Sequence, residues 1–232
     1  MKRFLLAAAI MLSAFLPAHA ATQPEIGIGI THSVAQPDGV WYQQRFSHTL
    51  KLDSPAFMLG ARGDVLPWLA WHADAVWLGR FTSNSQDTPN DANYSASSST
   101  GCNGQCLPMA NYIGSGTVYG VAATLEAHTQ GAWQVGVEAG PFLYRHSWTM
   151  SVPNWYSSTQ TGPSTFQAGA ASPVHTSDVG TGLGYVAGAW VRRGNTALNV
   201  RYYADGLGFP RSGDAWPPIW RFQWVVMLVQ AF

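Results

Sequence analysis

The feature that most constrains this chain is an alternation of side-chain character that recurs in eight segments. Within each segment, apolar or aromatic residues occupy every second position, and glycine, alanine and a few charged residues occupy the positions between them. Successive side chains of a β-strand point to opposite faces, so this pattern predicts strands with one apolar face. The segments lie at residues 26–31, 57–62, 69–77, 113–127, 133–140, 182–192, 198–203 and 220–232.

The polar faces of these segments predict the kind of barrel. A soluble barrel encloses an apolar interior, whereas a barrel in lipid needs apolar side chains outside and must pair its backbone polar groups in a closed sheet. Here one face is apolar throughout, and the charged residues are confined to the other face, at Arg62, His72, Asp74, Glu126, Glu138, Arg192, Arg201 and Arg221. The pattern therefore predicts apolar residues toward lipid and polar residues toward the barrel interior.

The spacing of the segments predicts the topology. Three short turns, at residues 64–67, 128–131 and 193–195, alternate with four long connections, at residues 33–55, 82–112, 147–179 and 205–219. Bacterial outer-membrane barrels have short periplasmic turns and longer extracellular loops. We therefore expect an all-β protein, a monomeric, eight-stranded antiparallel up-and-down transmembrane β-barrel with four long extracellular loops.

Composition agrees with a membrane protein that is not helical. Only 10% of the residues are charged, against roughly 25% in an average soluble domain. No apolar run beyond the N-terminus reaches the ~18 residues typical of a transmembrane helix. The 12 basic and 12 acidic residues cancel, and no basic cluster occurs, so we expect no nucleic-acid binding.

Residues 1–20 have the layout of a secretory signal peptide. Lys2 and Arg3 precede an apolar stretch, and Ala18-His19-Ala20 forms a small-x-small cleavage site. The apolar stretch is shorter than the ~20 residues that span a bilayer. We expect cleavage near Ala20 and Ala21, a mature barrel domain over residues 21–232, and an oxidising compartment.

Aromatic residues are predicted to form two rings that flank the lipid-facing band, because tryptophan and tyrosine favour membrane interfaces. The inner ring is expected to hold Trp71, Trp133 and Phe232, and the outer ring Trp77, Phe81, Trp148 and Trp220. Pro141 lies in the middle of a segment, and because proline cannot donate a ladder hydrogen bond we expect a bulge or local irregularity there.

Two stretches carry a resemblance to a known family. The chain finishes on Phe232 after apolar residues at alternate positions, and Pro67 to Gly79 is similar to the third strand of OmpA-like domains. The chain therefore resembles the small eight-stranded outer-membrane barrels of the OmpA/OmpX type of Gram-negative bacteria. Gln230 departs from the family pattern, being polar at an apolar position.

That resemblance implies several partners and a location. It places the protein in the outer membrane, in contact with outer-membrane lipid and lipopolysaccharide. It also implies recognition by the barrel-assembly machinery, through a signal formed by Trp224, Val226, Leu228 and Phe232.

Charged residues on the inner faces are predicted to pair with one another. An eight-stranded barrel is only wide enough for side chains to fill, and buried charges persist only with partners. We expect Glu126 and Glu138 to pair with Arg62, Arg201 or Arg221 rather than to act as catalytic carboxylates. We expect no metal site and no cofactor, and a narrow channel stays an alternative.

Cys102 and Cys106 are the only cysteines and lie in the second long loop. They have no neighbouring cluster of other metal ligands, and exported proteins occupy oxidising compartments, so we expect a disulfide between them.

An enzymatic function is the main alternative. His175 and Ser177, at the outer end of the sixth segment, and Asp205, at the outer end of the seventh, supply the residue types of a Ser–His–acid constellation. Outer-membrane lipid A deacylases are eight-stranded barrels with an H-x-S motif that His175-Thr176-Ser177 resembles. Those enzymes carry a glutamate shortly after the serine, and no Glu follows Ser177. A lipid A-modifying acyl hydrolase is therefore the second hypothesis, and our prediction is non-enzymatic.

The long connections lead to the predicted function. They are rich in Ser, Thr, Asn and Gly and carry aromatic residues such as Trp41, Tyr94 and Trp155. These residue types suit contact with surface glycans, another protein or the lipopolysaccharide zone, and equally suit solvated connectors. We predict a structural or cell-surface interaction role, with an extracellular ligand at the loops as the partner to seek.

Overall fold

The computed structural model describes residues 22–34, 48–51, 53–89, 109–153, 156–162, 165–171, 173–204 and 222–232. The regular elements in these ranges are strands: β1 Thr22–Val34, β2 His48–Lys51, β3 Asp53–Leu66, β4 Leu69–Pro89, β5 Met109–His128, β6 Trp133–Val152, β7 Tyr156–Gly162, β8 Thr165–Ala171, β9 Val174–Arg193, β10 Thr196–Ala204 and β11 Phe222–Ala231. No helix with the length and hydropathy of a membrane-crossing segment occurs in the described ranges.

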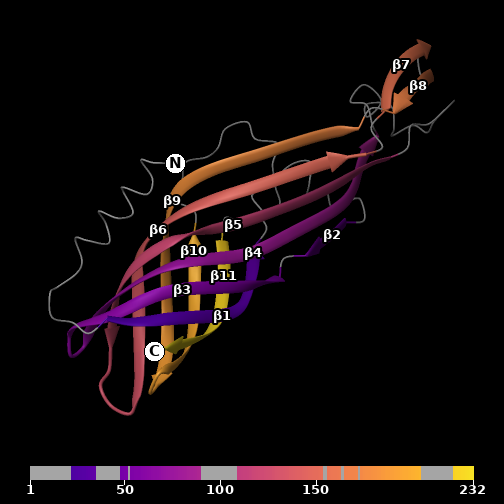
Figure 1. Ribbon diagram of the computed structural model, residues 1–232. Helices are drawn as coiled ribbons and strands as arrows, with labels where there is room; N and C mark the ends of the chain where they lie inside the picture. The colour runs from indigo at the N-terminus through magenta and orange to yellow at the C-terminus, as the bar shows by residue number, and fades with distance from the viewer. Residues whose placement is uncertain are drawn as a thin grey trace.

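Eight of these strands close into an antiparallel barrel (Figure 1). The ring runs β3, β1, β11, β10, β9, β6, β5 and β4, and β4 pairs back with β3. Strand β1 joins the last strand, β11, from Glu25 opposite Ala231 to Val34 opposite Phe222. The predicted all-β, eight-stranded antiparallel architecture is therefore confirmed. Strand β2 adds to β4 outside this ring, and β7 and β8 form a separate hairpin.

Three short turns join β3 to β4, β5 to β6 and β9 to β10, where the sequence predicts them. Gly131 and Gly194 have positive φ angles of 125° and 57° in two of these turns. Glycine adopts this backbone region without the steric cost that other residues meet, which explains its place in both turns.

The barrel strands differ in length. β4 has 21 residues, and β5, β6 and β9 have 20 each, whereas β10 has 9 and β11 has 10. The four long strands extend together beyond the shorter ones, away from the short turns (Figure 1). We call this part the projecting sheet. The connections predicted at 82–112 and 147–179 overlap the ends of these strands. The ladder continues there although the outer face carries hydroxyl residues, as at Thr82 and Thr149, in place of apolar ones.

The exposed and buried faces alternate as the sequence predicts. On β11, Leu228 is 53% exposed and its neighbour Met227 only 1%. The same alternation occurs on β3, where Phe57 and Leu59 are exposed and Met58 is buried. Exposed large apolar side chains occur on the outer faces of seven of the eight ring strands, and on β4 the outward Ala75 is exposed. Glycine, polar residues and a set of larger apolar and aromatic side chains point inward.

The prediction for the outer aromatic ring is wrong at two positions. Phe81 is 1% exposed and Trp148 is 6% exposed, so both face the interior. Phe81 turns inward because β4 has an extra residue between Trp77 and Arg80, and Gly79 takes a φ of 96° in this bulge. The two-residue alternation in the sequence of β4 does not indicate that a residue is inserted there.

Trp148 faces inward for the opposite reason. The expected irregularity at Pro141 does not shift the register, because β6 pairs with β9 without a break from Trp133 to Val152. Pairing with β5 is interrupted between Phe142 and Ala139 but resumes in the same register. Even-numbered residues of β6 therefore stay on the inner face along the whole strand.

The outer aromatic ring includes Trp77 as predicted, and its other members differ from the predicted ones. Outward aromatic side chains toward the projecting sheet are Phe57, Trp77, Tyr119, Tyr185, Tyr202 and Trp224. Phe57 and Trp77 stack with ring centroids 5.6 Å apart, and Tyr202 and Trp224 lie 4.8 Å apart. At the short-turn end Trp68, Trp133 and Phe232 are exposed, whereas Trp71 is buried beside Gly63. Trp220 lies outside the described residues.

Candidate functional site: barrel interior and outer rim

The interior near the short turns holds a connected set of charged side chains, which we call the charge network. Arg62 Nε donates to Glu126 Oε2 at 2.7 Å, and Arg62 Nη1 lies 2.9 Å from Asp64 Oδ1 at the β3–β4 turn. Glu126 lies directly opposite Glu138 on the neighbouring strand. Like charges in this position repel, and each carboxylate is offset by a different arginine.

Arg201 is the centre of the charge network. Its Nε and Nη2 donate to the two carboxylate oxygens of Glu138, both at 2.7 Å, and its Nη1 donates to Asp74 Oδ2 at 2.7 Å. Glu138 Oε2 also accepts a hydrogen bond from Thr124 Oγ1 at 3.0 Å. Bidentate arginine–carboxylate contacts of this kind are directional and charge-assisted. They tie β10 to β6 and β4 across the lumen.

A second branch of the charge network joins the first strand to the others. Arg192 Nη2 donates to Glu25 Oε1 at 2.5 Å. His72 lies between two carboxylates, with Nε2 3.1 Å from Glu25 Oε2 and Nδ1 3.1 Å from Asp74 Oδ2. The charge network thus links seven of the eight ring strands, all except β11.

The sequence identifies only part of this arrangement. The structure brings Glu126 to Arg62 and Glu138 to Arg201, and Arg221 lies outside the described residues. The prediction misses Glu25, which lies one residue before the alternating segment 26–31. Its alternation with Gly27 places it on the inner face, and that phase is the signal that could have found it.

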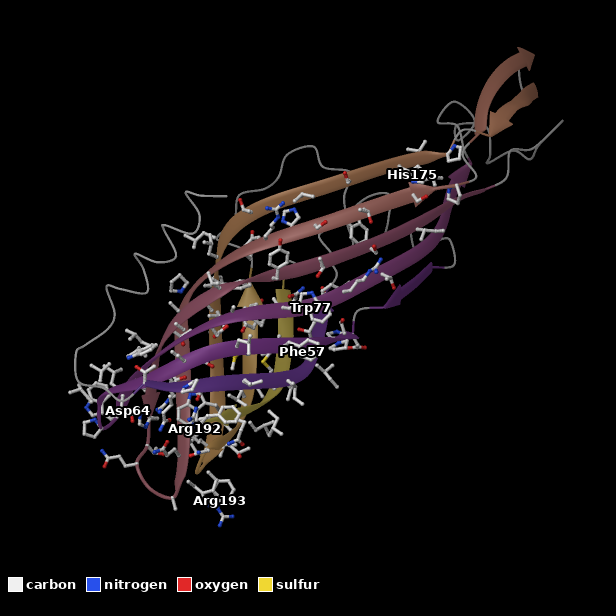
Figure 2. All side chains as sticks on the ribbon, viewed as in Figure 1. Phe57, Asp64, Trp77, His175, Arg192 and Arg193 are labelled. Atoms are coloured by element: carbon white, nitrogen blue, oxygen red, sulfur yellow. The ribbon has the colours of Figure 1, made fainter. Side chains whose placement is uncertain are left out.

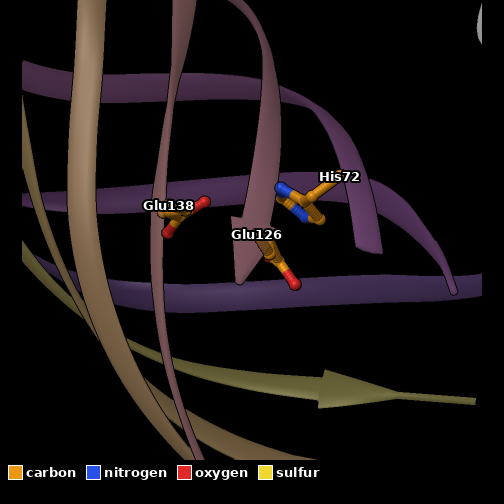
Figure 3. A group of neighbouring side chains, drawn as sticks. All are labelled: His72, Glu126 and Glu138. Atoms are coloured by element: carbon orange, nitrogen blue, oxygen red, sulfur yellow. The ribbon is translucent and has the colours of Figure 1, made fainter. Parts of the chain in front are cut away.

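Three members of the charge network have a geometry that resembles a metal site. His72, Glu126 and Glu138 offer ligand atoms within 4.8 Å of one another (Figure 3). Both carboxylates already accept hydrogen bonds from arginine. A cation bound here would have to displace Arg62 and Arg201, so the arrangement fits ion pairing better than metal ligation.

The interior above the charge network is packed with larger side chains. Phe142 and Tyr203 contact edge to face at 4.8 Å between centroids, and both are fully buried. Met58, Leu78, Val118 and Met227 are also buried in this layer. Large side chains thus occupy this layer of the lumen, as expected for a barrel of eight strands.

The candidate acyl-transfer residues lie far from this interior. His175 is exposed on the outer face of β9, at the end of the projecting sheet (Figure 2). Ser177, two residues along the same strand, is exposed on the same face. They pair with Ser151 and Thr149 of β6, so serine and threonine surround them. Asp205, the third member of the hypothesis, and Cys102 and Cys106, the predicted disulfide, lie outside the described residues.

The outer face of the projecting sheet changes from apolar to hydroxyl-bearing above the aromatic ring. One row across four strands reads Thr82, Ser115, Thr149 and Ser177. Arg80 Nη2 donates to Ser115 Oγ at 3.1 Å, and Ser115 Oγ lies 3.3 Å from Thr149 Oγ1. Trp77 Nε1 donates to Thr117 Oγ1 at 2.8 Å, which anchors the aromatic ring to the hydroxyl rows.

A hollow on the outer face lies directly below these hydroxyl rows, and we call it the outer groove. It has a volume of about 750 Å³, and its walls are mostly apolar and aromatic. Leu59, Ala75 and Val121 line its floor, Trp77 and Tyr119 its aromatic side, and Arg145 adds one cation. In Figure 2, Phe57 and Trp77 lie between Arg192 at the short-turn end and His175 at the far end.

The residues of the predicted assembly signal lie on the outer face of β11. Trp224, Val226 and Leu228 are exposed, and Phe232 is 67% exposed. Phe232 N donates to Pro24 O at 3.0 Å, which joins the last residue to β1. Gln230 is satisfied at the short-turn end, since its Oε1 accepts from Thr196 Oγ1 at 2.8 Å and its Nε2 donates to Ala231 O at 2.9 Å.

No protein-family description matches the chain, and no curated protein matches its sequence. Among solved structures, it is similar to the crystal structure of Ail, the attachment invasion locus protein of Yersinia pestis. Identity is 13%, the TM-score is 0.44, and 90% of this chain and 98% of that chain are covered. Ail in complex with the heparin analogue sucrose octasulfate gives 12% identity and a TM-score of 0.42, covering 91% and 99% of the two chains. The strand ladder described above gives this chain the eight-stranded up-and-down barrel that its resemblance to OmpA/OmpX-type proteins implies.

Proposed function

We propose that this chain is an integral outer-membrane β-barrel of a Gram-negative bacterium with a structural or cell-surface interaction role. The interaction surface is the end that carries the projecting sheet and the long connections, which faces the cell exterior. Residues 1–20 serve as the cleaved signal peptide, and residues 21–232 form the barrel. Cys102 and Cys106 form a disulfide in one extracellular loop, and the barrel is a monomer.

The observation that carries this proposal is the apolar band on the closed ladder. Soluble monomers rarely expose contiguous apolar patches larger than a few hundred Å². Here exposed isoleucine, leucine and valine side chains occur on seven of the eight ring strands, all except β4, with aromatic residues toward both ends. A closed ladder with its charges inside satisfies the backbone and leaves only apolar atoms for lipid.

Orientation and membrane insertion can be tested together. The purified protein should require detergent, and its folded form should migrate differently on a gel before and after heating. An epitope inserted between β7 and β8 should bind antibody on intact cells. The same epitope inserted after Gly131, in a short turn, should bind antibody only after the outer membrane is opened. A water-soluble protein without a heat shift would contradict the proposal.

The exposed side chain of Phe232 is proposed to act in recognition by the barrel-assembly machinery. Phe232→Ala should leave the β11–β1 pairing intact, because the contact to Pro24 uses the backbone amide. We expect several-fold less folded protein in the outer membrane and more unfolded protein in the periplasm. Trp133→Ala, at another exposed aromatic of the short-turn end, is the matched control. Equal yields for the two variants would contradict an assembly role for Phe232.

A further inference from the structure

We propose that the outer groove and the cations above it bind a lipid of the surrounding outer leaflet that carries two phosphate groups on a sugar headgroup. The inference rests on the proposed membrane location and adds a specific lipid class to it. In this arrangement one acyl chain lies in the outer groove, the phosphates contact Arg145 and Arg80, and the sugars face the hydroxyl rows.

The outer groove fits an acyl chain in shape and chemistry. The hollow spans strands β3 to β6 and reaches β9. Its floor is made of Leu59, Ala75 and Val121, and the small side chain of Ala75 leaves room between its larger neighbours. A chain lying there buries apolar surface on three sides instead of one.

The cations lie where a headgroup would meet them. Arg145 lines the outer groove, is exposed, and lies opposite Tyr119 of the aromatic ring. Within the described part of the chain, neither Arg145 nor Arg80 contacts a carboxylate. Among these described residues no acid offsets their positive charges at the aromatic ring, and an anionic headgroup supplies the complement.

The spacing of the two arginines favours two phosphates. Arg80 is on β4 and Arg145 is on β6, with β5 between them. Strands lie about 4.8 Å apart in a sheet, so the two backbones are roughly 10 Å apart. A single phosphate does not fill both positions, whereas a disaccharide with a phosphate at each end does. The hydroxyls of Ser115, Thr149 and Ser177 lie beyond them and can exchange hydrogen bonds with sugar.

Native mass spectrometry of the folded, purified barrel tests this proposal. The probes are a bisphosphorylated lipid A disaccharide, its monophosphorylated form, and phosphatidylglycerol. The wild type should retain the bisphosphorylated lipid most strongly and phosphatidylglycerol least. Arg145→Gln should weaken binding of the bisphosphorylated lipid about tenfold, the loss expected for one charge-assisted phosphate contact. The variant that also carries Arg80→Gln should lose the preference among the probes.

Matched variants separate this site from general effects of charge and bulk. Arg193→Gln removes an exposed arginine beside Trp133 at the other end of the barrel and should leave binding unchanged. Ala75→Trp fills the outer groove and should weaken binding of all three probes. Ala189→Trp adds the same bulk to the outer face of β9 outside the groove and should have no effect.

Three results would overturn the lipid site: equal binding by wild type and Arg145→Gln, equal binding of the bisphosphorylated and monophosphorylated lipids, or no effect of Ala75→Trp. A barrel that keeps its heat shift but shows no lipid preference would contradict this inference alone. A protein without the heat shift would contradict the proposed membrane location as well.

Discussion

Arg201→Leu is expected to lower the free energy of unfolding of the barrel by about 3–5 kcal/mol, the usual cost of removing one partner of a buried ion pair. The substitution leaves Glu138 and Asp74 buried without their shared guanidinium. It also removes contacts that join β10 to β6 and β4 through the lumen. Part of the cost comes from the two carboxylates, which cannot reach bulk water from inside a filled barrel.

The measurement is a urea titration of the protein folded in phospholipid vesicles, read as the fraction with folded gel mobility. Arg193→Leu is the control, because this arginine is exposed beside a short turn, where its guanidinium lies 5.1 Å from the centroid of the Trp133 ring. Its midpoint should change little. Arg201→Lys should lie between the two, since an ammonium group keeps the charge but cannot bond both oxygens of Glu138 in parallel. Equal midpoints for the two leucine variants would show that the charge network does not stabilise the fold.

Leu228→Arg is expected to cost about 2–4 kcal/mol if the apolar band lies in a bilayer, the range found for arginine near the midplane on a barrel's lipid face. Leu228 lies between Ile28 and Leu198 on the outer surface, remote from the aromatic residues at either end. In water the same substitution would replace an exposed apolar side chain with a charged one at little cost. The change in unfolding free energy therefore shows whether residue 228 is surrounded by lipid or by water.

Ser177→Arg provides the matched control for position 228. It places the same side chain on an outward-facing strand position, but on the projecting sheet above the aromatic ring. We expect its unfolding midpoint in vesicles to stay close to that of the wild type. If both arginine variants had wild-type stability in vesicles, the band at residue 228 would not be in contact with lipid.

The strands and their faces could be predicted from the sequence because each ring strand has an apolar face with a period of two. The sequence could not predict how far the long strands continue beyond the aromatic ring, where the outer face is no longer apolar. Above the aromatic ring, β5 and β6 carry Ser and Thr on the outer face, as at Ser115 and Thr149, whereas Trp148 of β6 is buried, so the apolar residues no longer mark the outer face although the pairing continues. The bulge at Gly79 could not be predicted for another reason. One inserted residue changes which side chains of β4 point inward without changing the composition of the strand.

The candidate sites differ in how far the sequence reveals them. Pairing of Glu126 and Glu138 with arginine could be expected, because a narrow barrel leaves inward charges few neighbours. Which arginine serves which glutamate depends on register and strand tilt, and Arg201 reaches Glu138 from a strand 63 residues away in the chain. The outer groove depends on the relative positions of five strands, and no stretch of sequence contains it.

In the proposed outer-membrane location, the unequal strand lengths give the barrel two different sides within the plane of the membrane. On one side β4, β5, β6 and β9 extend as the projecting sheet, and on the other side β10 and β11 are much shorter. A partner approaching along the cell surface would therefore meet the projecting sheet from one direction and the short strands β10 and β11 from the other. Access to the projecting sheet would then depend on how the barrel is rotated about the membrane normal and on which proteins lie beside it. A neighbouring protein against β5 would cover the projecting sheet, and one against β11 would leave it accessible.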